Sequence, residues 1–168
     1  MIDINFPDRL TDSLGASLFE IELPGEIGLN DVRDLDNEAN EYKYRTRDSQ
    51  ELFIICKTLA GNAYLQKTDS GDKRQHFFNL YDAAYCFDRA MNVAVDLNLP
   101  FTLKRAFEQY KEAYSQAEKI GKTNGLLRKL RKRSEIVKPW AEEVIEEKSP
   151  ITPPPYVKYD WLRMPISS

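Results

Sequence analysis

Residues 75–98 read QHFFNLYDAAYCFDRAMNVAVDLN, and this stretch decides the fold class of the chain. Its apolar side chains recur every three or four positions and cover more than half of a helical wheel: Phe77, Leu80, Tyr81, Ala84, Phe87, Met91 and Ala94. The polar residues form only a narrow stripe, made of Asn79, Asp82, Arg89, Asn92 and Asp96. Because a helix with so little polar surface is normally the centre of a bundle, the chain is predicted to be mainly α-helical.

The segments on either side continue the helical pattern. A helix over about 50–67 is predicted, because Asp48 to Glu51 resembles a capping box and Leu52, Ile55 and Leu59 follow with helical spacing. Another is predicted from Leu103 to Ile120, between Pro100 and Gly121. A helix over 31–46 with Asn30 as its cap has acids in its first turns and Lys43, Arg45 and Arg47 in its last. A short basic helix from Leu127 to Val137 is expected to kink or restart near Lys138, because Pro139 follows.

The two ends of the chain differ from this pattern. Residues 19–23 alternate apolar and acidic side chains before Pro24-Gly25, which predicts a half-buried strand. The last twenty residues carry prolines at 150, 153, 154, 155 and 165, which favour an extended arm. The predicted architecture is therefore a mainly α bundle of about four to five helices over residues 1–148. Residues 1–30 form an irregular or short β element, and 149–168 form a Pro-rich C-terminal arm.

Composition excludes several classes of protein. With 168 residues, 42% hydrophobic and 30% charged, the chain has the values of one globular domain. It has no apolar run long enough to span a membrane and no secretory signal pattern, so a cytoplasmic protein without membrane contact is expected. Cys56 and Cys86 lie in separate apolar runs, which favours free buried thiols. His76 is the only histidine, the glycines are dispersed and no phosphate-binding loop occurs, so no cofactor, metal or catalytic residue is predicted.

The net charge of −3 hides an uneven distribution along the chain. Residues 1–50 carry 12 acids and 5 bases, a net charge of −7. Residues 101–138 carry 4 acids and 11 bases, a net charge of +7. The acidic part can fold against the basic helices, or the basic part can remain free to bind a polyanion, and the sequence does not choose between the two.

The densest basic segment holds five cations in six residues, at 128–133. On a helix these side chains spread over about half of the circumference, and such a surface binds phosphates without needing a particular fold. The candidate nucleic-acid-binding residues are Lys122, Arg128, Lys129, Arg131, Lys132 and Arg133. The competing interpretation is a solvated helix, or one that pairs with the chain's own acids.

An enzymatic alternative rests on Glu41-Tyr42-Lys43. If this segment were a strand, Glu41 with Asp31 or Asp36 could hold Mg²⁺ while Lys43 steadied an attacking water, as in many nucleases. A helix over 31–46 would scatter these groups, which is why a metal-dependent nuclease is only the second alternative.

The arm combines prolines with large apolar side chains. Tyr156, Tyr159, Trp161, Leu162 and Met164, together with Val157, lie within nine residues. Burial of such a side chain stabilises by about 1.5–3 kcal/mol, so the arm is expected to dock, either on its own bundle or on a partner or second copy.

The resulting hypothesis is a non-enzymatic subunit of a larger assembly, such as a ribonucleoprotein. It would bind nucleic acid, RNA or single-stranded and with weak sequence specificity, through the basic helix, and protein through the arm. A protein-only adaptor or regulator is the first alternative.

Overall fold

The computed structural model describes residues 10–21, 28–41, 46–66, 72–121 and 125–147. In these ranges the regular structure is entirely helical, which confirms the prediction of a mainly α fold. The elements, in chain order, are α1 (Asp12–Ser17), the 3₁₀ helix η1 (Leu18–Glu20), α2 (Leu29–Glu41), α3 (Arg47–Gln66), α4 (Lys73–Asp96), α5 (Pro100–Ile120) and α6 (Leu126–Glu147).

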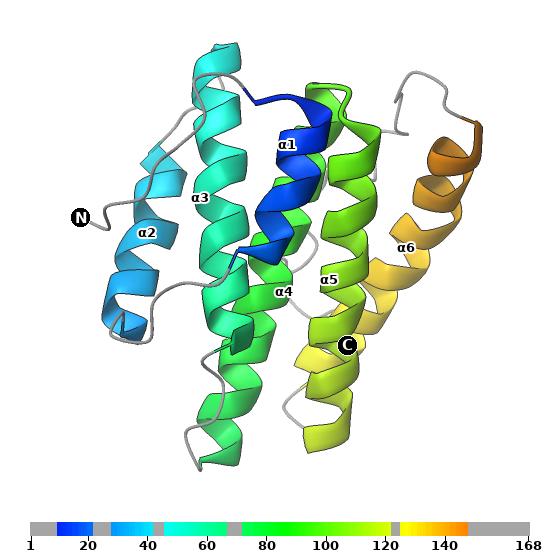
Figure 1. The fold of residues 1–168 in the computed structure, drawn as a ribbon. Coiled ribbons are helices and arrows are strands. Elements are labelled where there is room, and N and C mark those ends of the chain that lie inside the picture. Colours follow the sequence, from blue (N-terminus) through cyan, green and yellow to red (C-terminus); the bar gives the residue numbers. More distant parts are fainter. Residues whose placement is uncertain (1–9, 22–27, 42–45, 67–71, 122–124, 148–168) are drawn as a thin grey trace.

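The long helices form an antiparallel array with α4 near its centre (Figure 1). Each packs mainly on its neighbour in sequence, so that α2 covers α3, α3 and α5 flank α4, and α6 lies against α5 and the edge of α4. The short helix α1 packs on α5. Most of the apolar residues of α4 are completely buried, including Phe77, Leu80, Phe87 and Met91. The all-round apolar pattern of 75–98 therefore marks the central helix, as predicted.

Helix α1 is fixed to the start of α5 by hydrogen bonds from Asp12. The Asp12 carboxylate accepts the backbone N–H of Phe101 at 3.0 Å and that of Thr102 at 2.9 Å. These N–H groups lie in the first turn of α5, where the helix offers no carbonyl partners of its own. Nothing in the sequence around Asp12 indicates this long-range cap.

The N-terminal strand predicted over 19–23 is wrong for the residues that the structure describes. Leu18 to Glu20 form a 3₁₀ turn in which Leu18 and Phe19 are both buried, whereas a half-buried strand would alternate. The Asn62 amide donates to the Leu18 carbonyl at 2.8 Å and to the Ile21 carbonyl at 3.3 Å. Side chains of α3 thus satisfy carbonyls that a strand would have paired with another strand. Residues 22 and 23 lie outside the described part.

The start of α3 is capped two residues earlier than expected. Thr46 and Ser49 form a reciprocal pair, in which each backbone N–H donates to the hydroxyl of the other residue at 3.1–3.2 Å. The predicted capping box at Asp48 and Glu51 is therefore displaced to Thr46 and Ser49, and Glu51 instead pairs with Arg47 at 3.0 Å. A Thr-x-x-Ser pair satisfies the same two donors as the usual Ser-x-x-Glu.

Helix α2 starts earlier than predicted. It begins at Leu29 and its described part ends at Glu41, so Asn30 lies inside the helix and Arg47 belongs to α3. The carboxylate of Asp31 accepts the N–H of Gly28 at 3.1 Å and closes the entry to the helix. Lys43 and Arg45 lie outside the described residues.

The ends of α4 and α5 follow the sequence signals. Asp72 caps α4 by accepting the N–H groups of Arg74 and Gln75, and Pro100 is the first residue of α5. Gly121 ends α5 with a φ of +112°, a region that side chains other than glycine rarely adopt. The predicted break at Gly121 is confirmed.

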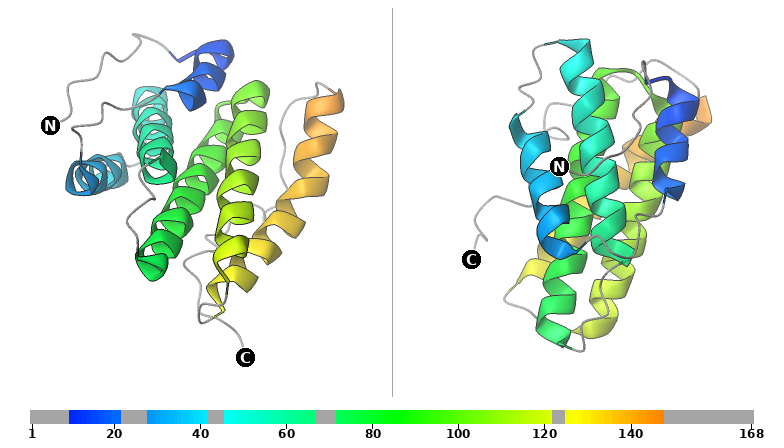
Figure 2. Two further views of the ribbon diagram at one scale, coloured as in Figure 1. Left: turned by 60° about the horizontal axis from the view of Figure 1, so that its bottom comes forward. Right: turned by 60° about the vertical axis from the view of Figure 1, so that its left-hand side comes forward.

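Of the kink or restart expected near Lys138, the structure shows the kink, because α6 continues across Pro139 from Leu126 to Glu147. A proline inside a helix removes one N–H and pushes on the preceding turn, which bends the axis. The left view of Figure 2 shows this axis changing direction between its yellow and orange parts. Pro139 is exposed, so water can reach the turn that the proline disturbs.

A close contact between α3 and α4, at Gly61, generates a stability prediction. A Cβ on Gly61 would lie 2.7 Å from the ring of Phe87, which is completely buried. Gly61→Ala should therefore lower the free energy of unfolding, by up to about 2 kcal/mol, because overpacking costs about 1–3 kcal/mol and the gain in helix propensity is only about 1 kcal/mol. Urea unfolding followed by circular dichroism measures this change.

Gly28→Ala is the matched control for that substitution. A Cβ on Gly28 meets nothing within 4 Å, so the stability should stay within about 0.5 kcal/mol of the wild type. A Gly61→Ala variant more stable than the wild type would contradict the tight packing described for Gly61.

Candidate nucleic-acid interface

Helix α6 has one face toward the bundle and one toward solvent. Leu130, Arg133, Val137 and Ala141 are buried and repeat at spacings of three and four. The exposed residues follow the same period on the other side: Arg128, Arg131, Lys132, Glu135, Lys138 and Pro139. The predicted basic helix is therefore amphipathic, with mostly cations outside.

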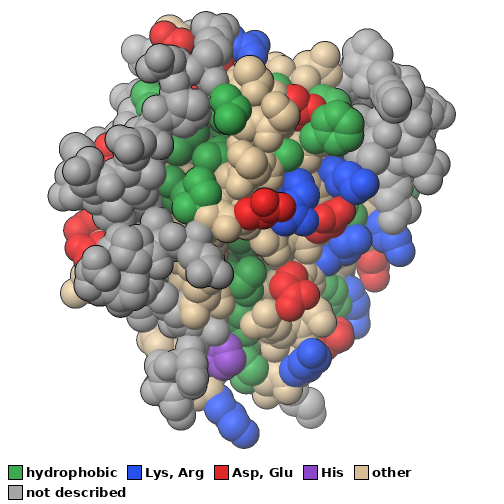
Figure 3. Space-filling view, viewed as in Figure 1, with side chains coloured by type: hydrophobic (Ala, Val, Ile, Leu, Met, Phe, Trp, Pro, Cys, Tyr) green, Lys and Arg blue, Asp and Glu red, His purple; other side chains and the backbone are tan. Residues whose placement is uncertain are grey.

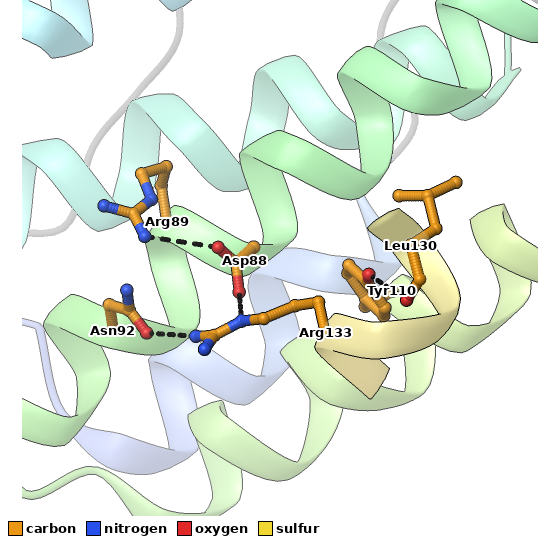
Figure 4. Close-up of polar contacts among 6 residues, drawn as sticks. All are labelled: Asp88, Arg89, Asn92, Tyr110, Leu130 and Arg133. Carbon is orange, nitrogen blue, oxygen red and sulfur yellow. Dashed lines mark hydrogen bonds and ion pairs between the residues drawn. The ribbon is translucent and has the colours of Figure 1, made fainter. Parts of the chain in front are cut away.

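Arg133 corrects the expectation that the whole basic segment faces solvent. Its side chain is 1% exposed and points into the bundle (Figure 4). Its Nε donates to Asp88 Oδ1 at 2.6 Å, and its Nη2 donates to Asn92 Oδ1 at 2.9 Å. Arg133 belongs to the core and is removed from the candidate interface.

The carboxylate of Asp88 is shared by two arginines of different helices. Arg133 of α6 binds one oxygen, and Arg89 of α4 binds the other through Nη2 at 3.2 Å. Asp88 is completely buried, and charge-assisted hydrogen bonds offset the cost of burying such a polar group. The pair therefore joins α6 to the central helix.

A second buried contact fixes α6 against α5. The Tyr110 hydroxyl donates to the backbone carbonyl of Leu130 at 2.7 Å. Burial raises the pKa of Tyr110 well above its usual range, and the neighbouring Asp88 carboxylate raises it further. The hydroxyl thus keeps the proton that it donates. Leu130 and Arg133 lie one helical turn apart. Their contacts fix the rotational setting of α6, that is, which of its faces points toward the bundle.

This setting exposes three of the predicted nucleic-acid-binding residues. Arg128, Arg131 and Lys132 face solvent and form no ion pair with a described residue. Lys129 is half-buried at the edge of this face, and Lys122 lies outside the described residues. Sequence reasoning missed Lys138, which is exposed on the same face; its position seven residues after Arg131 follows the helical period.

The seam between α5 and α6 carries charges of both signs around Tyr114, namely Glu118, Arg131 and Glu135. The Tyr114 hydroxyl donates to Glu118 Oε2 at 3.3 Å. Partial burial raises the pKa of Tyr114, Glu118 raises it further, and the positive charge of Arg131 opposes the shift. Arg131 is therefore close enough to this seam to influence the Tyr114 hydroxyl.

The α5 surface beside this helix carries charges of both signs. Figure 3 shows Lys and Arg side chains over α5 and α6, with acids interspersed among them. On α5, Arg105 pairs with Glu108 at 2.7 Å, and Gln116 donates to Glu112 at 2.8 Å. A concentrated positive face thus belongs to α6, where Glu135 is the one exposed acid among the described side chains.

The residues proposed for a nuclease are not assembled in the described part of the chain. Asp31 and Asp36 lie on a helix, not on a strand. Asp36 forms an ion pair with Lys57, whose ammonium lies over the rings of Phe53 and Tyr85. The side chain of Glu41 and all of Lys43 lie outside the description. Among described residues, no group of three His, Cys, Asp or Glu side chains is arranged to hold a metal.

Both cysteines are free and buried, as predicted. Burial raises the pKa of Cys56 to about 12, with a further contribution from Glu38 and opposition from Lys57. Burial likewise raises the pKa of Cys86 well above its usual range. Because the thiolate is the reactive form, these side chains act as apolar core residues.

The remaining predicted partner-binding residues, Tyr156, Tyr159, Trp161, Leu162 and Met164, lie outside the described residues. None of the helices in the described ranges combines the length and apolar character needed to cross a membrane. A scan against models of protein families and searches of curated proteins and solved structures found no significant match.

The buried pair predicts a large difference between neighbouring basic residues. Arg133→Met should lower the free energy of unfolding by about 3 kcal/mol, because Asp88 stays buried with only Arg89 to neutralise it. Arg131→Met is the matched control and should change stability by less than about 0.5 kcal/mol, because Arg131 is exposed. Chemical denaturation of both variants measures the difference. Equal stability losses would mean that Arg133 is not the inward residue.

Proposed function

We propose that this chain is a non-catalytic helical subunit that binds the phosphate backbone of nucleic acid through the outward face of α6. The observation that carries the proposal is the division of the basic segment. Arg133 is used internally, whereas Arg128, Arg131 and Lys132 are exposed without an ion pair to a described residue. If the basic segment served only to hold α6 on the bundle, one cation that points inward would be enough for that purpose.

The arrangement of these cations suits phosphate contacts. Arg128, Arg131, Lys132 and Lys138 extend over ten residues of one helix, which corresponds to about 15 Å along its axis. Phosphates recur along one strand of a nucleic acid every few ångströms, so several can be neutralised together. The face has no exposed aromatic side chain among its described residues. Binding of this kind depends on backbone charge and carries little sequence preference.

The overall charge of −3 is compatible with this proposal. The Debye length is about 8 Å at physiological ionic strength, so a polyanion responds to the local surface more than to distant charges. The acidic residues of α2 lie on the other side of α3 from α6 (Figure 1). The most acidic described helix and the basic face therefore do not screen each other.

Replacing Arg128, Arg131 and Lys132 with Gln tests the proposal. Binding to a labelled single-stranded oligonucleotide should weaken, and the slope of log K against log salt should flatten by about two to three units. Fluorescence anisotropy at several salt concentrations measures both quantities. Circular dichroism should show unchanged helix content, because the three side chains are exposed.

The matched control replaces three exposed or half-exposed cations of α5, namely Lys104, Arg105 and Lys111, with Gln. Its salt slope should stay close to that of the wild type, because acids of α5 accompany these cations. If the wild type shows no salt-dependent binding to RNA, single-stranded DNA or duplex DNA, the proposal is wrong. The protein-only adaptor then becomes the leading hypothesis.

The second part of the proposal assigns protein binding to the C-terminal arm, residues 149–168. It rests on the sequence, which places large apolar side chains and prolines together beyond α6. Deleting residues 150–168 should lower solubility or change the oligomeric mass, because an apolar surface would lose its cover. Light scattering and urea unfolding measure these effects. Unchanged mass, solubility and stability would contradict a docking role for the arm.

A further inference from the structure

The antiparallel order of the helices brings four helix ends together. Helices α3 and α5 end, and α4 and α6 begin, at the lower end of the bundle in Figure 1. We call this end the base, defined by the last turns of α3 and α5 (63–66 and 117–120) and the first turns of α4 and α6 (73–76 and 126–129). Two of these turns belong to α5 and α6, which form the seam beside the basic face.

The base is positively charged in its described residues. Its cations come from three helices and are Lys73 and Arg74 of α4, Lys119 of α5, and Arg128 and Lys129 of α6. The four helical turns contain one acid, Glu118, which accepts the Tyr114 hydroxyl. The α4 cap, Asp72, adds a second carboxylate, and this carboxylate accepts two backbone N–H groups.

Three of these cations, in addition to Arg128, are available at the surface. Lys73, Arg74 and Lys119 are exposed and form no ion pair with a described residue. Arg74 lies over the ring of Phe78, with its guanidinium carbon 5.8 Å from the ring centre. This contact orients the side chain at the start of α4 while leaving its donors exposed.

The opposite end of the bundle has the reverse charge. The first turns of α1, α3 and α5 and the last turn of α4 meet there, and their charged residues are Asp12, Asp48, Asp96 and Arg47. The Asp12 contacts with Phe101 and Thr102 confirm that α1 and α5 begin together. The described part of the bundle is thus polarised along its length, and Arg128 lies at its positive end.

From this placement we infer that the nucleic-acid-binding surface continues from α6 around the base to Lys119 and to Lys73 and Arg74 of α4. The inference rests on the proposed function and extends it from one helix to a footprint shared by three. Residues 73 and 128 are far apart in sequence, and the fold alone brings their helix ends together. The ligand class is a nucleic-acid strand, because its regularly spaced phosphates can contact the base and the α6 face at once.

The experiment compares two Lys-Arg pairs that differ in position. Lys73→Gln with Arg74→Gln removes two cations at the base, whereas Lys104→Gln with Arg105→Gln removes the same residue types near the opposite end. Binding of the full chain to a labelled 30-nucleotide single strand is measured over a range of salt concentrations. The base variant should weaken binding and flatten the salt slope by about one to one and a half units, since each phosphate contact contributes about 0.7. The control variant should keep the wild-type slope.

Each outcome separates the inference from the proposed function. If the α6 triple variant loses binding while the base variant matches the wild type, the inference is wrong and the proposed function stands. If both Lys-Arg variants weaken binding equally, the effect is one of total charge, and the shared footprint is wrong. If the wild type does not bind, both fail.

Direct contact is tested by a photo-reactive amino acid at position 73 or 119. Cross-linking to the oligonucleotide should occur there and should be absent at position 104. This readout does not depend on small changes in stability, so it remains decisive if the glutamine variants fold less well. Cross-linking at 104 but not at 73 or 119 would overturn the inference.

Discussion

The buried ion pair between Arg133 and Asp88 determines how the last helix sits on the bundle. Removing two charges from water costs several kcal/mol for each ion, and the attraction between them offsets this cost only when the geometry is good. Here Arg133 Nε lies 2.6 Å from Asp88 Oδ1, and the side-chain oxygen of Asn92 accepts a hydrogen bond from a second nitrogen of the guanidinium. With these bonds made, Leu130 and Val137 reach the core while Arg128, Arg131 and Lys132 face solvent. The candidate interface therefore depends on a residue that is not part of it.

A similar pair joins the outer helix on the other side of the array. Asp36 of α2 pairs with Lys57 of α3, a lysine that is 1% exposed and lies beneath the rings of Phe53 and Tyr85. The central hairpin of α3 and α4 is packed mainly through apolar contacts, as its completely buried leucines and phenylalanines show. Helices α2 and α6 each pack mainly on one long helix. Each therefore adds a buried charge pair to a smaller apolar contact. In both cases a buried charged residue of the central hairpin, Lys57 or Asp88, fixes the position at which the outer helix packs.

Apolar spacing predicted most of the helices, because a helix that buries one side must repeat apolar residues about every 3.6 positions. The predictions fail where the position of a residue depends on a contact with a residue that is distant in sequence. The pattern of the basic helix predicted over 127–137 does not single out Arg133, but Asp88, 45 residues away, draws this residue into the core. The alternation at 19–23 suggested a strand, whereas Asn62 and Gln66 of α3 supply the hydrogen bonds of that segment. The run of basic residues at 128–133 therefore predicted a basic surface, but it could not show that Arg133 points into the core.

The value of a buried pair at this position lies in specificity more than in stability. An apolar residue at 133 would avoid desolvation, and such replacements of a complete buried pair are often neutral or stabilising. Helix α6, however, carries cations over much of its circumference, and its apolar stripe of Leu130, Val137 and Ala141 is narrow. A narrow stripe alone would tolerate a rotated packing in which Arg131 or Lys132 faced the bundle. Such a rotation would leave the Asp88 carboxylate buried without Arg133, at a cost larger than the apolar contacts could recover. The pair thus excludes the alternative settings and keeps the same cations outside, which a binding surface built on one helix face requires.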